Sequence, residues 1–578
     1  MPSPAYDRRA FMSYFSSIGL GSTLLPGVLW GRIAAGADIT SESIACAAEV
    51  SGLDFDETER ELMLEGLKRQ TARLEALHAI PLANAVAPAI IFDPRPVHPV
   101  GAAAVPPAPA SPMQRSRVTV PAVPRSLDAL AFAPVTVLSE LIRTKRVTSE
   151  QLTRMYLARL ERYDPQLECV VSLTTERALR QARERDAELD RGRYRGPLHG
   201  IPWGAKDLLA TKGYKTTWGA GPYREQMIDE DAEVVQRLDD AGAVLVAKLT
   251  LGELAQGDRW FGGMTKNPWK LDQGSSGSSA GPASATAAGL VAFAIGSETL
   301  GSISSPATRC GVTGLRPTFG RVPRTGAMAL SWSMDKLGPI GRSVEDCALV
   351  FDAIHGPDGR DKSCIAAPFA WDATLAPSAL RIAYVKTAFD LPETDPDNAE
   401  RRLHPTKAYD DAALETLRRA GARLLPVELP EIAYDAMRII LTAEAAAAFD
   451  DLTRSDKDAE LVQQGQFDWA NTFRTARFIP AVDYINANRV RSSAIEAWDT
   501  VFRHIDVIVT PTSASGLSQL VATNLPGHPA VILPHGFRDD GTPVSLTFLG
   551  RLFGERALLA VAHAFQQATD WHLRHPSL

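Results

Sequence analysis

Cysteine is scarce in this sequence, and the few copies are scattered. The five cysteines are dispersed along the chain, none of them in a C-x-x-C pair, at Cys46, Cys169, Cys310, Cys347 and Cys364. An H-E-x-x-H segment is also missing. An odd, dispersed set of cysteines argues against a disulfide framework, and the missing motifs give no indication of a zinc site. We therefore expect neither a metal nor a cofactor.

An excess of positive charge is also absent. The 578 residues include 61 Lys and Arg against 68 Asp and Glu, so the formal net charge is −7. A chain that binds nucleic acid through a basic surface normally carries the opposite balance, so we expect no nucleic-acid partner. Hydrophobic residues make up 45% and charged residues 22%, which is typical of a globular protein with a large core. We find no internal repeat, and the sequence does not indicate an oligomeric state.

The N-terminal stretch lacks the long apolar run of a membrane-spanning helix. Residues 13–30 are uncharged but contain a proline and several small polar residues, so we expect no stable membrane span. Arg8 and Arg9 precede this stretch, and paired arginines before a weakly apolar run are typical of a twin-arginine export signal. We predict that residues 1–37 are such a signal and that the protein is periplasmic or otherwise exported. The alternative is a cytoplasmic protein whose N-terminal helix packs on the body.

The rest of the chain divides by composition into three parts. Residues 38–92 form a predicted helical extension, because apolar residues recur at helical spacing between charged ones. Residues 93–125 are rich in proline and alanine, which favours an extended linker or a strap on the surface. Residues 126–578 form one large predicted catalytic domain.

Helical and strand-like patterns alternate within residues 126–578. Thr148 and Gln151 form a capping box that predicts the start of a helix. The further predicted elements are helices over residues 232–241 and 280–289, and strands over residues 244–247, 290–295, 380–385 and 505–510. This alternation predicts an α/β fold with a central mixed sheet.

The chemistry is concentrated in two segments of small residues. Residues 274–318 contain two serine clusters, GSSGSSAG and GSISSPA, separated by a predicted helix and strand. Upstream, Lys206 lies in the apolar, glycine-flanked segment GIPWGAKD. A serine hydroxyl needs a base to become a nucleophile, and a buried neutral lysine can be that base. One lysine and two serines can therefore form a nucleophilic site that needs no histidine.

These segments resemble the amidase signature family, from about residue 126 to the C-terminus. The family carries G-I-P-x-x-x-K-D, then G-G-S-S-G-G, then G-T-D-x-G-G-S-I-R-x-P-A. Position by position, Lys206 corresponds to the family lysine and Ser278 to the bridging serine, which is held in a cis peptide. Ser302 corresponds to the acyl-accepting nucleophile. The resemblance implies a single large domain with an open mixed sheet covered by helices on both faces.

The resemblance also implies an oxyanion hole made by the backbone N–H groups of Thr299, Leu300 and Gly301. Departures from the family pattern lie close by. Leu300 replaces a glycine, Glu298 replaces the usual aspartate, and Ser304 replaces the usual arginine. A leucine keeps its N–H but lacks glycine's freedom at positive φ, and we expect its side chain to narrow the acyl pocket.

The resemblance implies a serine amidohydrolase that cleaves a small-molecule amide to an acid and an amine. Lys206 takes a proton from Ser278, which takes one from Ser302, and Ser302 forms the acyl-enzyme. Aryl, fatty and carbamate-type amides are the candidate substrates. Aromatic residues near the motifs are candidates for an apolar substrate pocket, namely Trp203, Trp260, Phe261 and Trp269.

Three other interpretations are open. Some family members are the glutamine-hydrolysing component of a transfer-RNA amidotransferase, which passes ammonia to a partner. A second interpretation is a non-catalytic binding protein that retains the fold. The third is a nucleophile elbow at Ser279, since Gly277–Gly281 satisfies G-x-S-x-G and His355 or His528 could complete a triad. An elbow must follow a buried strand, however, and the residues before Ser279 are typical of a loop.

The export signal can be tested directly. Replacing Arg8 and Arg9 with Lys should leave the full-length precursor in the cytoplasm of an exporting bacterial host, because the twin-arginine pair is what the export machinery reads. Cell fractionation and immunoblotting measure the distribution. Unchanged distribution of the double variant would contradict the signal interpretation.

Overall fold

The computed structural model describes residues 39–50, 52–96, 113–512 and 516–578. The predicted export signal, residues 1–37, lies outside the described residues, as does part of the proline- and alanine-rich segment.

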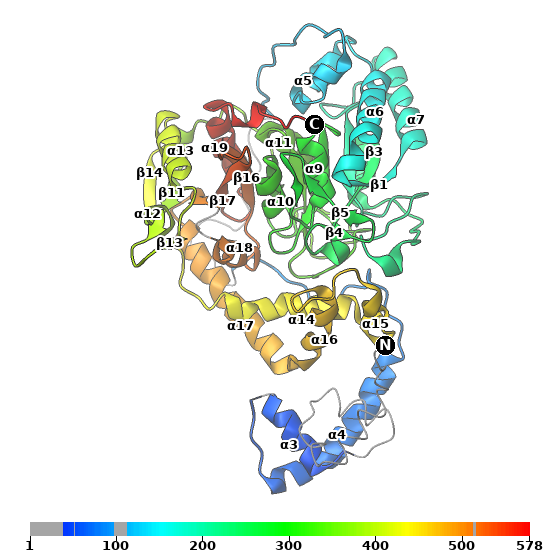
Figure 1. Cartoon of the computed structure of the whole chain (residues 1–578), viewed down its shortest axis with the longest axis vertical. Helices are drawn as coiled ribbons and strands as arrows, with labels where there is room; N and C mark the ends of the chain where they lie inside the picture. The colour runs from blue at the N-terminus through cyan, green and yellow to red at the C-terminus, as the bar shows by residue number, and fades with distance from the viewer. Residues whose placement is uncertain (1–38, 51, 97–112, 513–515) are drawn as a thin grey trace, which may run out of the picture.

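An 11-stranded mixed sheet forms the centre of the protein (Figure 1). In spatial order its strands are β1 (Val170–Leu173), β3 (Val244–Leu249), β2 (Pro202–Lys206), β8 (Phe293–Glu298), β10 (Lys336–Gly341), β9 (Thr313–Arg316), β16 (Ala530–Phe537), β17 (Pro543–Gly550), β15 (Val507–Pro511), β11 (Ile382–Val385) and β14 (Leu424–Val427). Strand β2 runs parallel to both β3 and β8, whereas β10 is antiparallel to β8 and β9. The predicted α/β fold with a central mixed sheet is confirmed.

Both faces of the sheet are buried, as the alternation of side chains along β3 shows. Leu245 belongs to the largest core cluster, whereas Val244 and Val246 belong to a different one. Successive side chains of a strand point to opposite faces, so each face packs on its own layer. The helices that supply these layers are α5 (Val135–Arg143), α6 (Ser149–Leu167), α7 (Thr175–Asp190), α8 (Glu233–Asp240), α9 (Ala280–Ala287), α10 (Ser304–Cys310), α11 (Val344–Ile354), α13 (Lys407–Arg419) and α19 (Glu555–Gln567).

Several predicted elements match closely. Helix α6 begins with the predicted capping box of Thr148 and Gln151, and α8, α9 and β3 lie where the sequence predicts them. Strand β8 begins at Phe293, later than predicted, because α9 ends at a left-handed Gly289 and the following residues form bends. Strand β8 ends at Glu298, immediately before residues 299–301, which form the predicted oxyanion loop.

A second group of helices lies below the sheet in Figure 1. It consists of α14 (Ile439–Ala448), α15 (Asp450–Arg454), α16 (Trp469–Thr475), α17 (Ala481–Phe502) and α18 (Gly516–Asn524). Short elements complete the described chain, with α12 (Lys386–Asp390) and the paired strands β12 (Thr394–Asp395) and β13 (Asn398–Arg402), β4 (Arg259–Trp260) and β5 (Gly263–Met264), and β6 (Lys266–Asn267) and β7 (Lys270–Gly274).

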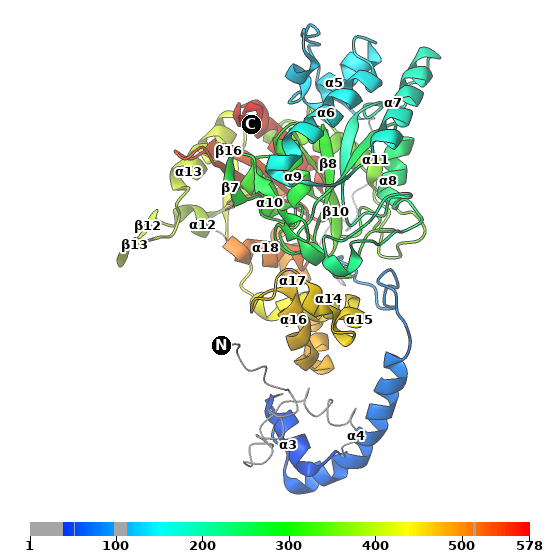
Figure 2. The same cartoon turned by 45° about the vertical axis from the view of Figure 1, so that its right-hand side comes forward.

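The N-terminal extension holds two helices, α3 (Ser41–Val50) and α4 (Glu57–His78), and Asp56 caps the second. From α4 the chain runs back along the lower helices to the body, as Figure 2 shows. No helix within the described residues is both long and apolar enough to cross a membrane. Nor do the described residues contain a cluster of three or more His, Cys, Asp or Glu side chains that could hold a metal ion.

Candidate active site

Lys206 is the last residue of β2 and is fully buried. Its Nζ donates hydrogen bonds to three serine hydroxyls, at 2.8 Å from Ser278 Oγ, 2.9 Å from Ser297 Oγ and 3.1 Å from Ser279 Oγ. The carboxyl end of strand β2 places the lysine where the two serine clusters meet. The structure therefore joins Lys206 and Ser278, which are far apart in the sequence.

Burial lowers the pKa of the Lys206 amine well below its usual value, because removal from water disfavours the charged form. The charges of Asp335 and Glu298 oppose this shift without reversing it. Asp207 does not contribute, since its carboxylate pairs with Lys248 at 2.7 Å and accepts a hydrogen bond from the Thr217 backbone. The neutral amine is thus accessible at a lower pH than for an exposed lysine, as a general base requires.

Ser278 lies in a tight loop before α9, and the Gly277–Ser278 peptide bond is cis, as the family resemblance implies. A Cβ on Gly277 would lie 1.7 Å from the Gly257 carbonyl oxygen, so no larger residue fits there. The next residue, Ser279, donates its N–H to the Ser302 carbonyl at 3.0 Å. This hydrogen bond joins the two serine clusters directly.

Ser302 follows β8 and precedes α10, and its side chain is 9% exposed. Within the described residues its hydroxyl has no hydrogen bond, and neither do the N–H groups of Thr299, Leu300 and Gly301 donate one. Gly301 has a φ of +98°, but Leu300 is not among the residues with positive φ. Position 300 therefore does not require glycine's conformational freedom, and the N–H groups of residues 299–301 have no acceptor among the described residues.

The Leu300 side chain does not pack as we expected, in a position that narrows the acyl pocket. It is partly buried against a small cluster that includes Met334, Met437 and Ile440. Its apolar surface therefore joins the loop before β10 to the lower helices, and the expectation that it narrows the acyl pocket finds no support in this packing.

Glu298 holds the loop that carries Ser302. Its carboxylate is fully buried, pairs with Arg316 at 2.8 Å and accepts hydrogen bonds from the backbone N–H groups of Ile303 and Ser304. It also accepts hydrogen bonds from the Ser304 hydroxyl and from Asn524, each at 2.8 Å. The positive group beside this carboxylate is therefore Arg316, on β9. Ser304, at the position where the family usually has arginine, supplies only a hydroxyl.

A cavity of about 590 Å³ lies beside this site, and Lys206, Ser278 and Ser302 are not among the residues that line it. Ser297 and Thr299 are part of its wall, together with Asp335 and with residues of the N-terminal extension. Sequence reasoning missed Ser297 and Asp335. Ser297 directly precedes Glu298 within the recognised motif, which could have identified it. Asp335, which accepts a hydrogen bond from the Thr299 hydroxyl at 2.6 Å, has no such sequence feature.

The residues of the nucleophile-elbow interpretation do not come together. Ser279 follows a loop and bonds to Lys206 and to the Ser297 backbone. His528 bonds the Gly550 carbonyl through Nδ1, and His355 packs against aromatic rings. Neither histidine contacts Ser279.

The aromatic residues proposed from the sequence for a substrate pocket also lie elsewhere. Trp203 is in the core against Phe293, Trp260 packs edge-on against Phe261, and Trp269 bonds the Cys310 carbonyl. None of the four lines the cavity beside Ser297.

Comparison with known proteins gives a consistent picture. Residues 151–520 match the family model described as Amidase. Over 482 residues the chain is 36% identical to the A component of the glutamyl-tRNA(Gln) amidotransferase of Methylococcus capsulatus, covering 75% of this chain and 97% of the relative. The same protein of Moorella thermoacetica is 35% identical, with 76% and 97% covered. The solved peptide amidase of Stenotrophomonas maltophilia is 32% identical with a TM-score of 0.67, covering 78% of this chain and 99% of that one.

The Glu298 cluster yields a stability prediction. Glu298→Ala leaves Arg316 buried without a partner, and breaking a buried pair in this way costs about 3–5 kcal/mol of unfolding free energy. Urea unfolding followed by fluorescence measures the loss. Glu65→Ala, at an exposed ion pair in α4, is the matched control and should change stability by no more than about 0.5 kcal/mol. Equal effects of the two variants would contradict the role of Glu298.

The same cluster has a pH signature. Burial alone would raise the pKa of Glu298, but the Arg316 charge and several hydrogen bonds lower it from its usual 4.5 to about 2. A carboxyl with a lowered folded-state pKa stabilises the protein fully above its unfolded-state pKa and loses that contribution as the pH falls toward its folded-state value. The difference in stability between wild type and Glu298→Ala should therefore be constant above about pH 5 and shrink as the pH is lowered through the range below it.

Proposed function

The chain belongs to the amidase family, and from that premise we propose that it hydrolyses carboxylic amides through an acyl-enzyme on Ser302. The family and its amidase and amidotransferase relatives identify it as an enzyme that cleaves amide C–N bonds, which removes the interpretation as a non-catalytic binding protein. The observation that carries the proposal is the 2.8 Å hydrogen bond between the buried Lys206 amine and Ser278.

The proposed first step is proton transfer from Ser302 through Ser278 to neutral Lys206. Ser302 then attacks the amide carbonyl, and the free N–H groups of residues 299–301 bind the oxyanion. The proton passes back to the leaving amine, which departs, and water hydrolyses the acyl-enzyme along the same path. The lowered pKa of Lys206 and the unpaired N–H groups support these assignments.

For the substrate we propose a small-molecule amide with an apolar acyl group, hydrolysed by the chain alone. Apolar side chains line much of the cavity beside Ser297, among them Leu208, Leu330 and Leu337. The named activity of the Stenotrophomonas maltophilia relative, a peptide amidase, is compatible with such a substrate.

A second candidate is the glutamine-hydrolysing component of an amidotransferase, which would act with a partner protein. Sequence comparison favours this candidate over the stand-alone enzyme, because the curated relatives at 36% and 35% identity are amidotransferase components matched over 97% of their length. Against it, about a quarter of this chain has no counterpart in those relatives, and part of the N-terminal extension lines the cavity.

Lys206→Ala tests the proposed base. General-base catalysis contributes about 10²- to 10⁴-fold, so the variant should lose at least that factor in kcat/KM. For the wild type, kcat/KM should rise with pH through the lowered pKa of Lys206 and then level off, because only the neutral amine accepts a proton. The Lys206→Ala profile should lack this rise. A variant with wild-type rate and profile would rule out Lys206 as the base.

The two substrate candidates are separated by assaying the purified full-length chain alone. It should release ammonia or amine from apolar and aryl amides, and Ser302→Ala should not. A phosphonylating serine reagent should attach to Ser302 in the wild type, as peptide mapping would show. Activity on glutamine only, and only with an added partner protein, would instead establish the second candidate.

A further inference from the structure

The cavity beside Ser297 adjoins another cavity. A second cavity, of about 660 Å³, shares with it the wall residues Asn84, Ala85 and Glu230 and the loop of residues 326–328. We call the cavity with Ser297 the inner compartment and its neighbour the outer compartment. The two adjoin, and part of the wall between them comes from the N-terminal extension.

That part of the extension, residues 80–92, is here called the covering segment. Asn84 fixes it with both ends of its side-chain amide. Its Oδ1 accepts the Ala329 N–H at 2.8 Å, and its Nδ2 donates to the Ala329 carbonyl at 2.8 Å and to the Ala448 carbonyl at 3.3 Å. One side chain therefore ties the covering segment both to a loop of the sheet domain and to the C-terminal end of α14.

A second anchor lies at the other end of the covering segment. The Phe92 ring packs edge-on against Phe319 at 5.0 Å, and the Arg491 guanidinium lies 3.3 Å from the centre of the same ring. Between the anchors, Ile90 and Ile91 line the inner compartment although both are exposed to solvent. Because these exposed apolar side chains line the compartment, an apolar molecule that fills it would bury part of their surface.

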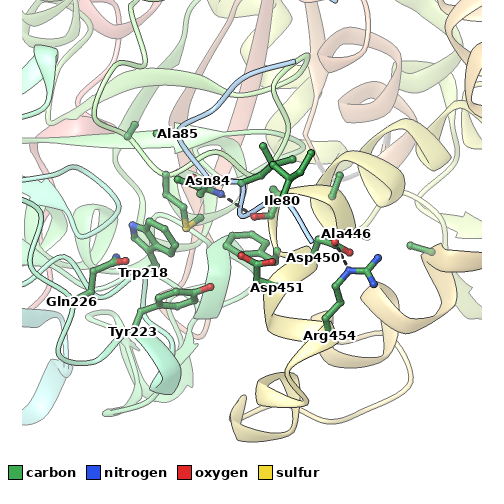
Figure 3. A pocket seen from close by; sticks show the side chains of 18 of the residues that line it. Ile80, Asn84, Ala85, Trp218, Tyr223, Gln226, Ala446, Asp450, Asp451 and Arg454 are labelled. Atoms are coloured by element: carbon green, nitrogen blue, oxygen red, sulfur yellow. Dashed lines mark hydrogen bonds and ion pairs between the residues drawn. The ribbon is translucent and has the colours of Figure 1, made fainter. Parts of the chain in front are cut away.

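The outer compartment has an aromatic wall. Figure 3 shows Trp218 and Tyr223 on one side, Asp450 and Arg454 on the other, and Ile80 and Asn84 between them. The Trp218 ring lies 4.6 Å from Tyr223 and 6.1 Å from Phe449. Burial, with a smaller effect of Asp451, raises the pKa of Tyr223 to about 12, so its phenol stays neutral.

The charged groups at the rim are mostly neutralised by each other. Asp450 pairs with Arg454 at 2.6 Å and also with Arg477, and Glu230 pairs with Arg360 at 3.2 Å. An occupant would therefore contact three aromatic rings together with a larger number of alanine and aliphatic side chains. An aromatic group that contacts these rings gains attraction beyond simple area burial.

We propose that the covering segment is part of the substrate site, and that the outer compartment binds an aromatic group at the far end of an amide that runs through the inner compartment and presents its reacting carbonyl to Ser302, beside Ser297 and Thr299. This inference rests on the proposed amide hydrolysis and specifies its substrate class. The covering segment lies outside the residues that match the family model, whereas the aromatic rings of the outer compartment lie within them, so the proposed site combines both parts of the chain.

The test uses two series of amides, ω-phenylalkanamides and n-alkanamides of increasing chain length. With the full-length wild type, kcat/KM for the phenyl series should rise sharply at the length that lets the ring enter the outer compartment. Filling a pocket of this kind changes kcat/KM by about tenfold or more. The n-alkanamides should show no such step.

Two variants act on the compartment from different elements. Ala447→Phe places a ring in the outer compartment from α14, where Ala447 is exposed and lines the cavity. Asn84→Ala releases the covering segment. Each should lower the ratio of kcat/KM for the long phenyl amide to that for butanamide by about tenfold. Controls are Ala412→Phe on α13 and Asn486→Ala on α17, both exposed and outside both compartments, which should keep the wild-type ratio.

A binding measurement on an inactive variant tests this inference independently of the proposed amide hydrolysis. Calorimetric titration of Ser302→Ala with the long phenyl amide should give tighter binding than with the n-alkanamide of equal length, and adding Ala447→Phe should remove the difference. If the wild type hydrolyses neither series, the proposed function fails while this binding result still decides the inference. Equal binding of both amides, or variants that lower all rates alike, would overturn it.

Discussion

The geometry around Ser302 depends on one buried carboxylate. Glu298 ends β8 and accepts hydrogen bonds from the first turn of α10, from Arg316 on β9 and from Asn524 on α18. A buried carboxylate with fewer partners would be protonated or would disrupt the core, since an unpaired charge is costly in a medium of low polarity. Because Glu298 precedes Ser302 and its partners all follow Ser302 in the sequence, these bonds hold the loop that carries the serine against the sheet. Glu298 is longer than the aspartate usual in the family, and Ser304 replaces the usual arginine. Both side chains belong to the same hydrogen-bonded cluster.

A second constraint is the lysine that β2 delivers to the serines. Hydroxyl groups can accept a hydrogen bond and yet carry no charge, so three of them can surround the Lys206 amine without raising its pKa as a carboxylate in contact would. Asp207, the adjacent carboxylate, is directed to Lys248 instead. Lys206 is the last residue of β2 and Asp207 begins the turn that follows, so these two neighbouring side chains have separate partners.

The sequence predicted the fold class, and it predicted that Lys206 and Ser278 lie together, whereas the catalytic roles assigned to Ser278 and Ser302 stay predictions. Those residues belong to ordered motifs with fixed spacing, so Lys206 and Ser278 could be selected without coordinates. Contacts that depend on packing could not be predicted in this way. Asp335 arrives from a distant loop, Leu300 turns toward Met334, and the aromatic wall is built by Trp218 and Tyr223 instead of the tryptophans nearest the motifs. Runs of apolar residues such as 290–292 have no period that separates bend from strand, and so the start of β8 was placed too early.

The hydrogen bond from the Ser279 N–H to the Ser302 carbonyl has a consequence for motion. It links the backbone that follows the bridging serine to the backbone of the nucleophile, and Gly277 is packed too closely against Gly257 to allow much independent displacement. Displacement of one serine loop would therefore strain this hydrogen bond unless the other loop followed. Proton transfer along a chain of hydroxyl groups is sensitive to changes in their separation more than to their common position. A backbone hydrogen bond that restrains the two loops relative to each other would therefore preserve that separation in the proton relay proposed above.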